Sequence, residues 1–299
     1  TTRKDLVKMT ALLIIGILGV DYYYQTNIQW MNLWHYSERH RTMMSGLFVY
    51  LGPNHYGAFF VHFIFILLGL FFFDRSKARK IIFLSIVSFS IYCIIYTYSR
   101  GAYLALIVGV VFIGIFKDKK ILALLFIFLL FWRSLVPISV VERIDMTRTE
   151  DGQLESSAAL RIELWNAAMG MFHESPILGK GFNTFRQTTS NGETFTDTHN
   201  FYLKMLAEQG IIGLIAFLLL LGYAFMTGWS LYRQSSYWLF KGLGLGFAAC
   251  VIAVAVTNIF GNRWSYMCLG AYFWIFWAIA AKARVIDKLE PVPVEDNIK

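Results

Sequence analysis

The segment that decides the fold is YGAFFVHFIFILLGLFFF, residues 56–73, followed directly by DRSKARK, residues 74–80. The first stretch contains no side chain that is charged at neutral pH, and the second is mostly charged and basic. A bilayer core of ~30 Å requires roughly 20 predominantly apolar residues in one helix. The pair of stretches therefore predicts a membrane-crossing helix that ends in a basic turn.

Working outward, seven more stretches of this kind are present. They cover about residues 5–24, 81–98, 101–116, 121–141, 210–229, 242–260 and 264–281. The composition agrees, because 57% of the residues are hydrophobic and 15% are charged, whereas soluble domains have about 25% charged residues. We therefore predict an all-α, polytopic membrane helix bundle with about eight helices and a large, partly helical loop.

Basic residues indicate how the helices are oriented. They cluster at 3–8, 74–80, 117–120 and 282–288, and eight crossings put all four clusters on one side. The positive-inside rule assigns that side to the cytoplasm. The prediction is a multi-pass inner-membrane protein with helices one to five in 1–141, an outer segment at 25–55, a large periplasmic loop at 142–209, helices six to eight in 210–281 and a cytoplasmic tail at 282–299.

The long loop should carry structure of its own, because unstructured loops of this length are uncommon in compact proteins. Its middle places apolar residues at helical spacing, namely Leu160, Leu164, Ala168 and Met171. Gly179 and Gly181 predict a bend after this helix. Thr198 is a candidate cap for a second helix that returns to the bilayer.

Arg100 lies where the third helix meets the outer interface, directly after Ser99. An arginine at a membrane helix is costly unless it reaches water or pairs with an anion. One reading is an interfacial side chain that reaches the head groups. The other is a guanidinium fork that binds a phosphate, since its planar donors match phosphate oxygens.

The loop contributes further candidates. Arg161 lies on the predicted loop helix, and Lys180, Arg186 and Lys204 add positive charge to the same region. Each of them singly could be a solvated surface charge, while together they favour an anionic substrate. The basic balance of +8 is spread over connections and this loop, so we expect no nucleic-acid partner.

His199 and Asn200 stand at the start of the returning helix. A histidine titrates near neutral pH and can serve as a general base toward a hydroxyl group, although a lone histidine at a helix start can also be a cap or a surface residue. The six histidines and the three cysteines show no convincing ligand spacing. We therefore predict no metal and no cofactor.

Four blocks, read in order, have a family pattern. They are GPNHYGA at 52–58, which contains Asn54; YSRGA at 98–102; ALRIELW at 159–165 with SPILGKGFNTF at 175–185; and THNFYL at 198–203 with LAEQGIIGL at 206–214. In these blocks the chain resembles the O-antigen ligase and polymerase superfamily of membrane glycosyltransferases. Members usually have more than eight membrane helices, so the resemblance implies that an N-terminal portion is missing from this sequence.

The resemblance implies a metal-independent transfer of glycan from an undecaprenyl-diphosphate carrier to an acceptor hydroxyl at the periplasmic face. The acceptor would be the lipid A core for a ligase, or a growing glycan for a surface polysaccharide polymerase. Arg100 and Arg161 would hold the diphosphate, and His199 would activate the acceptor. Asn200, Ser99, Asn54, Arg186 and Lys180 would contribute to substrate binding.

Two other readings stay open from the sequence. A protein-glycosylating oligosaccharyltransferase uses the same donor chemistry. A transporter or flippase of lipid-linked oligosaccharides would also place arginines near a diphosphate, but it would more often show inverted repeats and broken helices at mid-membrane depth.

Overall fold

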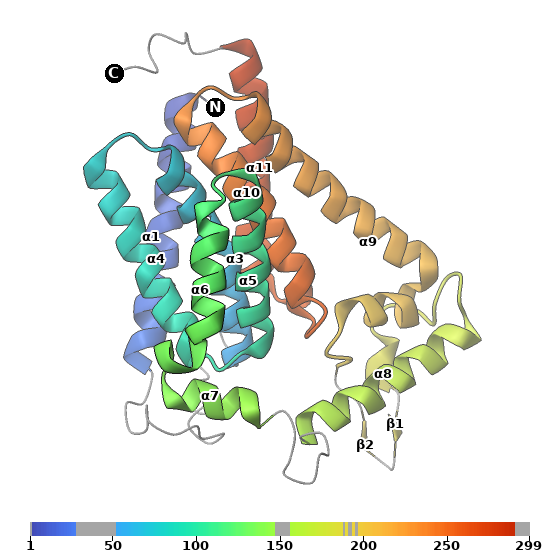
Figure 1. The fold of residues 1–299 in the computed structure, drawn as a ribbon. Helices are drawn as coiled ribbons and strands as arrows, with labels where there is room; N and C mark the ends of the chain where they lie inside the picture. The colour runs from blue at the N-terminus through green and yellow to red at the C-terminus, as the bar shows by residue number, and fades with distance from the viewer. Residues whose placement is uncertain are drawn as a thin grey trace.

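The computed structural model describes residues 2–27, 52–146, 156–187, 189–190, 193–194 and 197–290. Within these ranges the fold is all-helical, as predicted, apart from one hairpin of two short strands (Figure 1). The elements are α1 (Arg3–Asn27), α3 (Pro53–Phe73), α4 (Lys77–Tyr96), α5 (Arg100–Phe116), α6 (Lys120–Leu135), α7 (Ile138–Asp145), α8 (Ser156–Glu174), η2 (Thr184–Gln187), β1 (Thr189–Ser190), β2 (Glu193–Thr194), α9 (Phe201–Gln234), α10 (Trp238–Thr257), η3 (Arg263–Ser265) and α11 (Met267–Leu289).

All eight predicted apolar stretches fall on helices, but they are not equivalent. In the described part of the chain, six helices are long and apolar enough to cross a membrane: α1, α3, α4, α9, α10 and α11. The α5 helix is apolar but has 17 residues, which is short for a ~30 Å core. Counting α6 with α7 as one broken span brings the number to seven.

The predicted span at 121–141 is two helices and not one. The α6 helix ends at Leu135, and α7 leaves it at an angle of 99°. The break is at Pro137, because proline has no backbone N–H and disfavours the α conformation at the residue before it. Arg133 at the end of α6 forms an exposed ion pair with Asp145, 2.7 Å away, and this pair joins the two arms of the bend.

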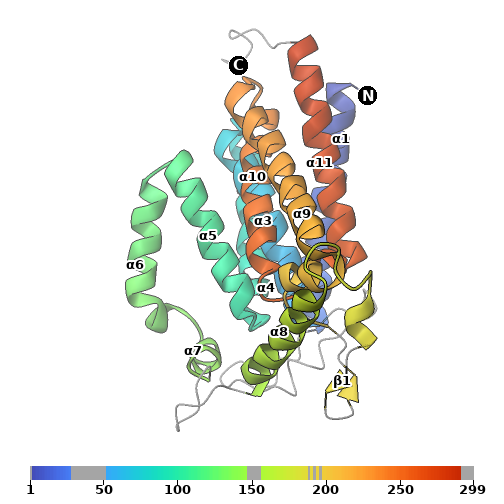
Figure 2. The ribbon, with the colours of Figure 1, turned by 90° about the vertical axis from the view of Figure 1, so that its right-hand side faces the viewer.

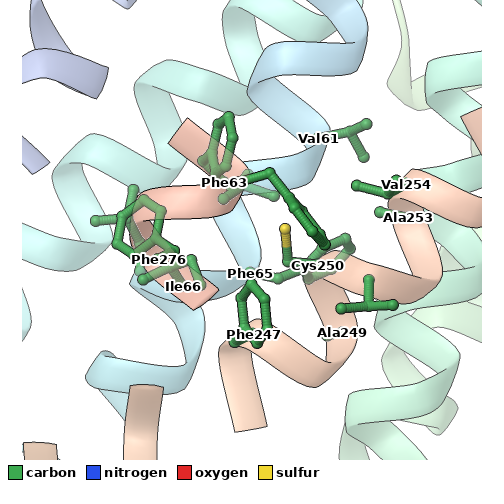
Figure 3. Close-up of a cluster of buried hydrophobic side chains, with 14 of the residues drawn as sticks. Val61, Phe63, Phe65, Ile66, Phe247, Ala249, Cys250, Ala253, Val254 and Phe276 are labelled. Atoms are coloured by element: carbon green, nitrogen blue, oxygen red, sulfur yellow. The ribbon is translucent and has the colours of Figure 1, made fainter. Parts of the chain in front are cut away.

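The α3 and α10 helices form the centre of the bundle. Buried side chains from both helices and from α11 pack together there, including Phe63, Cys250 and Phe276 (Figure 3). The two backbones approach so closely at Gly69 that a Cβ atom there would overlap the carbonyl of Gly242. Such contacts between small residues are how membrane helices associate without a hydrophobic driving force.

The two ends of the bundle differ. The described chain begins and ends at one end, together with the turn between α5 and α6, whereas α7, α8 and the hairpin lie at the other (Figures 1 and 2). We call these the termini end and the loop end. All four basic clusters, at 3–8, 74–80, 117–120 and 282–288, belong to the termini end.

At the loop end, α8 packs on the first part of α9 through a small core of its own, formed by Leu164, Ala168, Phe185 and Ala207. The predicted stripe is correct for Leu164 and Ala168, with Met171 packing beside them, but Leu160 is 47% exposed.

The α9 helix is longer than the predicted stretch at 210–229 and bends at Gly210, whose φ of 64° lies in the left-handed region. The loop 175–181 fits into this bend. The Ile211 N–H donates to the Pro176 carbonyl at 2.9 Å, and a Cβ atom on Gly210 would overlap the Ile177 carbonyl. The glycine bend predicted from the sequence therefore holds the kink of α9.

Two predicted boundaries remain. The helix cap at the start of α9 is Asn200 and not Thr198, because the Asn200 side chain accepts hydrogen bonds from the N–H groups of Tyr202 and Leu203. The α11 helix continues through Leu289, beyond the boundary at 281, and residues 291–299 of the predicted tail lie outside the described residues. So do residues 28–51 of the predicted outer segment.

Candidate functional site

A cavity of about 290 Å³ opens at the loop end, where α3, α5, α7, α8 and η3 meet. Its lining includes polar residues from the turn before α5, from α3 and from α8. The full set is Asn54, Ala58, Tyr98, Ser99, Arg100, Gly101, Ala102, Leu104, Arg143, Ala158, Arg161, Thr257, Phe260 and Arg263. We call it the arginine cavity.

Four arginines from four elements line this cavity. Arg100 is the first residue of α5, Arg143 lies on α7, Arg161 on α8 and Arg263 in η3. Arg143 and Arg263 are 3% and 7% exposed, so their charges are held largely away from bulk water. Such a concentration of partly desolvated cations favours a multiply charged anion with several acceptor oxygens.

Two helix N-termini add to the positive potential. The α3 helix begins at Pro53 and contributes Asn54, and the α5 helix begins at Arg100 just after Ser99. The unpaired N–H groups at a helix start carry partial positive charge and favour anions. Both helices therefore reinforce the four guanidinium groups.

A tight turn places Ser99 and Arg100 at the cavity. Tyr98, the residue before them, has a φ of 51° and so lies in the left-handed region, which is uncommon for a residue other than glycine. Its hydroxyl donates to Ser139 Oγ of α7 at 3.2 Å, and this contact joins the turn to the second arm of the α6–α7 bend. The strained turn thus fixes the start of α5 relative to α7.

His199 lies beside the arginine cavity and not in its lining. It precedes α9, is partly buried and has a φ of 52°. Burial lowers the pKa of His199 below its ordinary value of 6.5; Asp197 opposes this, while Arg161 and Arg263 lower the pKa further. At neutral pH the imidazole is therefore neutral, which is the form that can accept a proton.

The other predicted site residues divide into three groups. Asn54 and Ser99 line the arginine cavity together with Arg100 and Arg161. Asn200 is buried, and its side-chain oxygen accepts the hydrogen bonds that cap α9. Lys180 forms an exposed ion pair with Glu174, and Arg186 lines a different cavity on the side of α9.

Sequence reasoning missed three residues here: Arg143, Arg263 and Asp197. Arg263 stands between two apolar stretches, in the short connection from α10 to α11, and an arginine at that depth is itself a signal of function. Arg143 follows the helix break at Pro137, which lies inside the stretch 121–141 that the sequence analysis predicted as one uninterrupted span. Asp197 lies two residues before His199, and no pattern distinguished it from other loop carboxylates.

An apolar cavity of about 330 Å³ lies next to these residues, between α4, α5, α6 and α7. Its lining is almost entirely aliphatic and aromatic: Ile91, Ile94, Ile95, Tyr103, Leu106, Ile107, Phe128, Leu129, Trp132, Leu135, Val136, Val140 and Ile144. The short α7 helix serves both cavities, because Arg143 lines the arginine cavity while Val140 and Ile144 line the apolar one.

These features describe a multi-pass membrane protein with a cationic cavity at one end of its helices and an apolar cavity beside it. Residues 85–218 match the family model described as O-antigen ligase. The chain is also 30% identical over 151 residues to the O-antigen ligase of Pseudomonas aeruginosa, an alignment that covers 46% of this chain and 36% of that protein. The expected resemblance to the O-antigen ligase superfamily is confirmed.

The matched segment contains much of the site. Arg100, Arg143, Arg161 and His199 all fall within residues 85–218, whereas Asn54 and Arg263 lie outside it. The chain spans about a third of the length of the relative, at 36%. Three of the lining polar residues, Asn54, Thr257 and Arg263, therefore come from parts of the chain that the family model does not cover.

Proposed function

We propose that this protein is a metal-independent membrane glycosyltransferase that moves a glycan from undecaprenyl diphosphate to an acceptor hydroxyl at the periplasmic face. It would act as an O-antigen ligase on the lipid A core, or as a surface polysaccharide polymerase on a growing glycan. The observation that carries the proposal is the convergence of four arginines from four elements on one cavity. A diphosphate carries the charge and the acceptor oxygens that such a cavity favours.

The donor would bind across the two adjoining cavities. Its diphosphate would occupy the arginine cavity, held by Arg100 and Arg161, with Arg143 and Arg263 completing the positive shell. Its polyprenyl chain would enter the apolar cavity on the other side of α7. A charged group joined to a long hydrocarbon chain is the ligand that this pairing of cavities suits.

The reaction then needs one bond exchange and one proton transfer. The acceptor oxygen forms a bond to the anomeric carbon while the bond from that carbon to the diphosphate oxygen breaks. His199 takes the acceptor proton, and the arginines stabilise the negative charge that develops on the leaving diphosphate. The lowered pKa of His199 keeps the imidazole ready to accept that proton at neutral pH.

The orientation follows from the charged turns. The basic clusters at the termini end support a cytoplasmic position for that end, in accordance with the positive-inside rule. The loop end, with the arginine cavity, would then face the periplasm of a cell inner membrane.

Glycan transfer in cells that lack the native enzyme tests the proposal. Arg100→Ala, Arg161→Ala and His199→Ala should each abolish transfer, with lipid-linked donor accumulating, at membrane abundance equal to that of the unchanged protein. Arg133→Ala and His173→Ala are the matched controls, because both side chains are exposed and neither lines the arginine cavity.

The product that disappears would distinguish a ligase from a polymerase. Normal transfer in all three site variants would refute the proposal that the protein is a glycosyltransferase with this active site. If donor accumulated only on the cytoplasmic face, a flippase of lipid-linked oligosaccharides would be the better account.

A further inference from the structure

A third cavity adjoins η3, the short helix that also contributes Arg263 to the arginine cavity. It encloses about 710 Å³ along one face of α9, where α9 diverges from α10 and α11 toward its N-terminal end (Figure 1). Its lining is Phe182, Asn183, Arg186, Phe201, Lys204, Met205, Glu208, Gln209, Gly213, Ala216, Phe217, Leu220, Trp264 and Ser265. We call it the α9 groove.

The groove changes character along its length. Its end nearest the loops contains Arg186 and Lys204 with Asn183, and neither cation forms an ion pair with a carboxylate in the described part of the chain. Its other end is apolar and runs along Gly213, Ala216 and Leu220, which share one face of α9 at helical spacing. From the kink at Gly210 to Leu220 the second arm of α9 rises roughly 15 Å, which is about half the thickness of a ~30 Å bilayer core.

Aromatic rings form the middle of the groove. Phe217 packs edge-on against both Phe201 and Trp264, with ring centroids 4.8 and 5.1 Å apart. Phe182 is 83% exposed and lies at the polar end. Ring faces beside amide and charged side chains suit a sugar, whose rings combine apolar C–H faces with hydroxyl edges.

A thin wall separates this groove from the arginine cavity. One part of it is η3, in which Arg263 lines the arginine cavity while Trp264 and Ser265 line the groove. The other part is the segment 197–201, because Phe201 lines the groove while Arg161 and Arg263 of the arginine cavity are near enough to His199 to lower its pKa. Asn258 joins the two parts, because its carbonyl accepts from Phe201 N–H at 2.9 Å and its Oδ1 accepts from Trp264 N–H at 3.0 Å.

We propose that the α9 groove binds the acceptor, a membrane lipid whose head group is an anionic saccharide. Arg186 and Lys204 would bind its negative groups, the aromatic rings would pack on its sugars and the apolar end would take its hydrocarbon. The acceptor hydroxyl would approach the donor at the wall, beside His199. The inference rests on the proposed function, because it assigns the second substrate of that reaction to its own site.

Photo-crosslinking tests binding without requiring transfer. The whole protein in nanodiscs would be exposed to lipid A with its core oligosaccharide, carrying a diazirine on one acyl chain, and the labelled peptides would be mapped. We expect labelling within 213–220 that unlabelled core lipid removes, with little from phosphatidylglycerol carrying the same diazirine. Equal labelling by phosphatidylglycerol, or labelling confined to the exposed side chains Ile211, Ile215 and Leu218, would overturn the proposal.

Two variants with one control sharpen the test. Ala216→Trp fills the groove, and Arg186→Glu reverses a charge on an exposed side chain, so that its folding should be unaffected. Each should remove the specific label and raise the KM for the acceptor about tenfold while the KM for the donor stays unchanged. Leu219→Trp, on the outward face of the same helix at 68% exposure, should change neither.

The two proposals fail separately. If Arg100→Ala, Arg161→Ala and His199→Ala all kept transfer, the enzyme mechanism would be refuted, while specific labelling of the groove would still identify a saccharide-lipid site. If those variants lost transfer but the groove gave no specific label, the acceptor site would have to lie elsewhere and this inference alone would be wrong.

Discussion

Arg263 and Trp264 are consecutive residues of η3, yet Arg263 lines the arginine cavity and Trp264 lines the α9 groove. A 3₁₀ turn has about three residues per turn, so neighbouring side chains point in well-separated directions. One short turn between α10 and α11 therefore contributes to two cavities. It also lies outside the segment 85–218 that matches the family model.

Arg263 should be as necessary as the arginines that the sequence indicated. We expect Arg263→Ala to lower the rate of glycan transfer by a factor of roughly 10²–10³. This is the effect of removing one preorganised hydrogen-bond donor that faces a developing negative charge. Transfer assays at equal membrane abundance measure this. Arg133→Ala is the control, and an Arg263→Ala variant with normal transfer would show that three arginines suffice.

The pH dependence of transfer should report His199. Its pKa is lowered below 6.5, chiefly by burial, and the general base must be neutral to act. Activity should therefore stay constant as the pH falls to 6.5 and decline only as it passes through the lowered pKa. A decline in activity whose midpoint lies at pH 6.5 or above would argue against His199 as the base.

Asp197→Asn should shift this acidic decline in activity, which we call the acid limb of the pH profile, in a defined direction. Asp197 raises the pKa of His199 against the effect of burial, so its neutralisation lowers the pKa further and shifts the limb to lower pH. Asp145→Asn is the control, because Asp145 pairs with Arg133 at the α6–α7 bend. A shift toward higher pH in Asp197→Asn would contradict the electrostatic account of this segment.

Gly210→Ala should destabilise the protein. A residue with a side chain pays about 1–3 kcal/mol for the left-handed conformation, and its Cβ atom would also overlap the Ile177 carbonyl. We expect reduced thermal stability in detergent and reduced abundance in the membrane. Gly222→Ala on the same helix is the matched control, since a Cβ atom there meets nothing within 4 Å, and equal behaviour of the two variants would rule out a structural role for the kink.

Filling the apolar cavity should weaken binding of the donor according to its chain length. Ile107→Trp, inside the cavity, should raise the KM for a long-chain polyprenyl diphosphate glycan more than for a short-chain analogue. Leu124→Trp, on the exposed face of α6 at 67%, should change neither value. An Ile107→Trp effect that is the same for both chain lengths would place the hydrocarbon elsewhere.

Much of this protein could be derived from the order of its residues. In the described part of the chain, the apolar runs located the six helices that are long enough to cross a membrane and also the shorter α5 and α6, because hydrocarbon thickness sets the length of a span and a bilayer core requires every backbone group to bond within the helix. The spacing of Leu164 and Ala168 located the loop helix, and Gly179 with Gly181 located the bend. Arg100 could be singled out because a charge at that depth is costly without a purpose.

The tertiary structure alone decided which of these residues meet. Arg100, Arg143, Arg161 and Arg263 are far apart in the chain, and their convergence depends on the break at Pro137, on the turn at Tyr98 and on the docking of α8 against α9. The same packing put Arg186 in another cavity and used Asn200 as a helix cap. Helix formation depends on local spacing and solvent, whereas a cavity depends on how several helices pack against one another, and no single stretch of sequence encodes that.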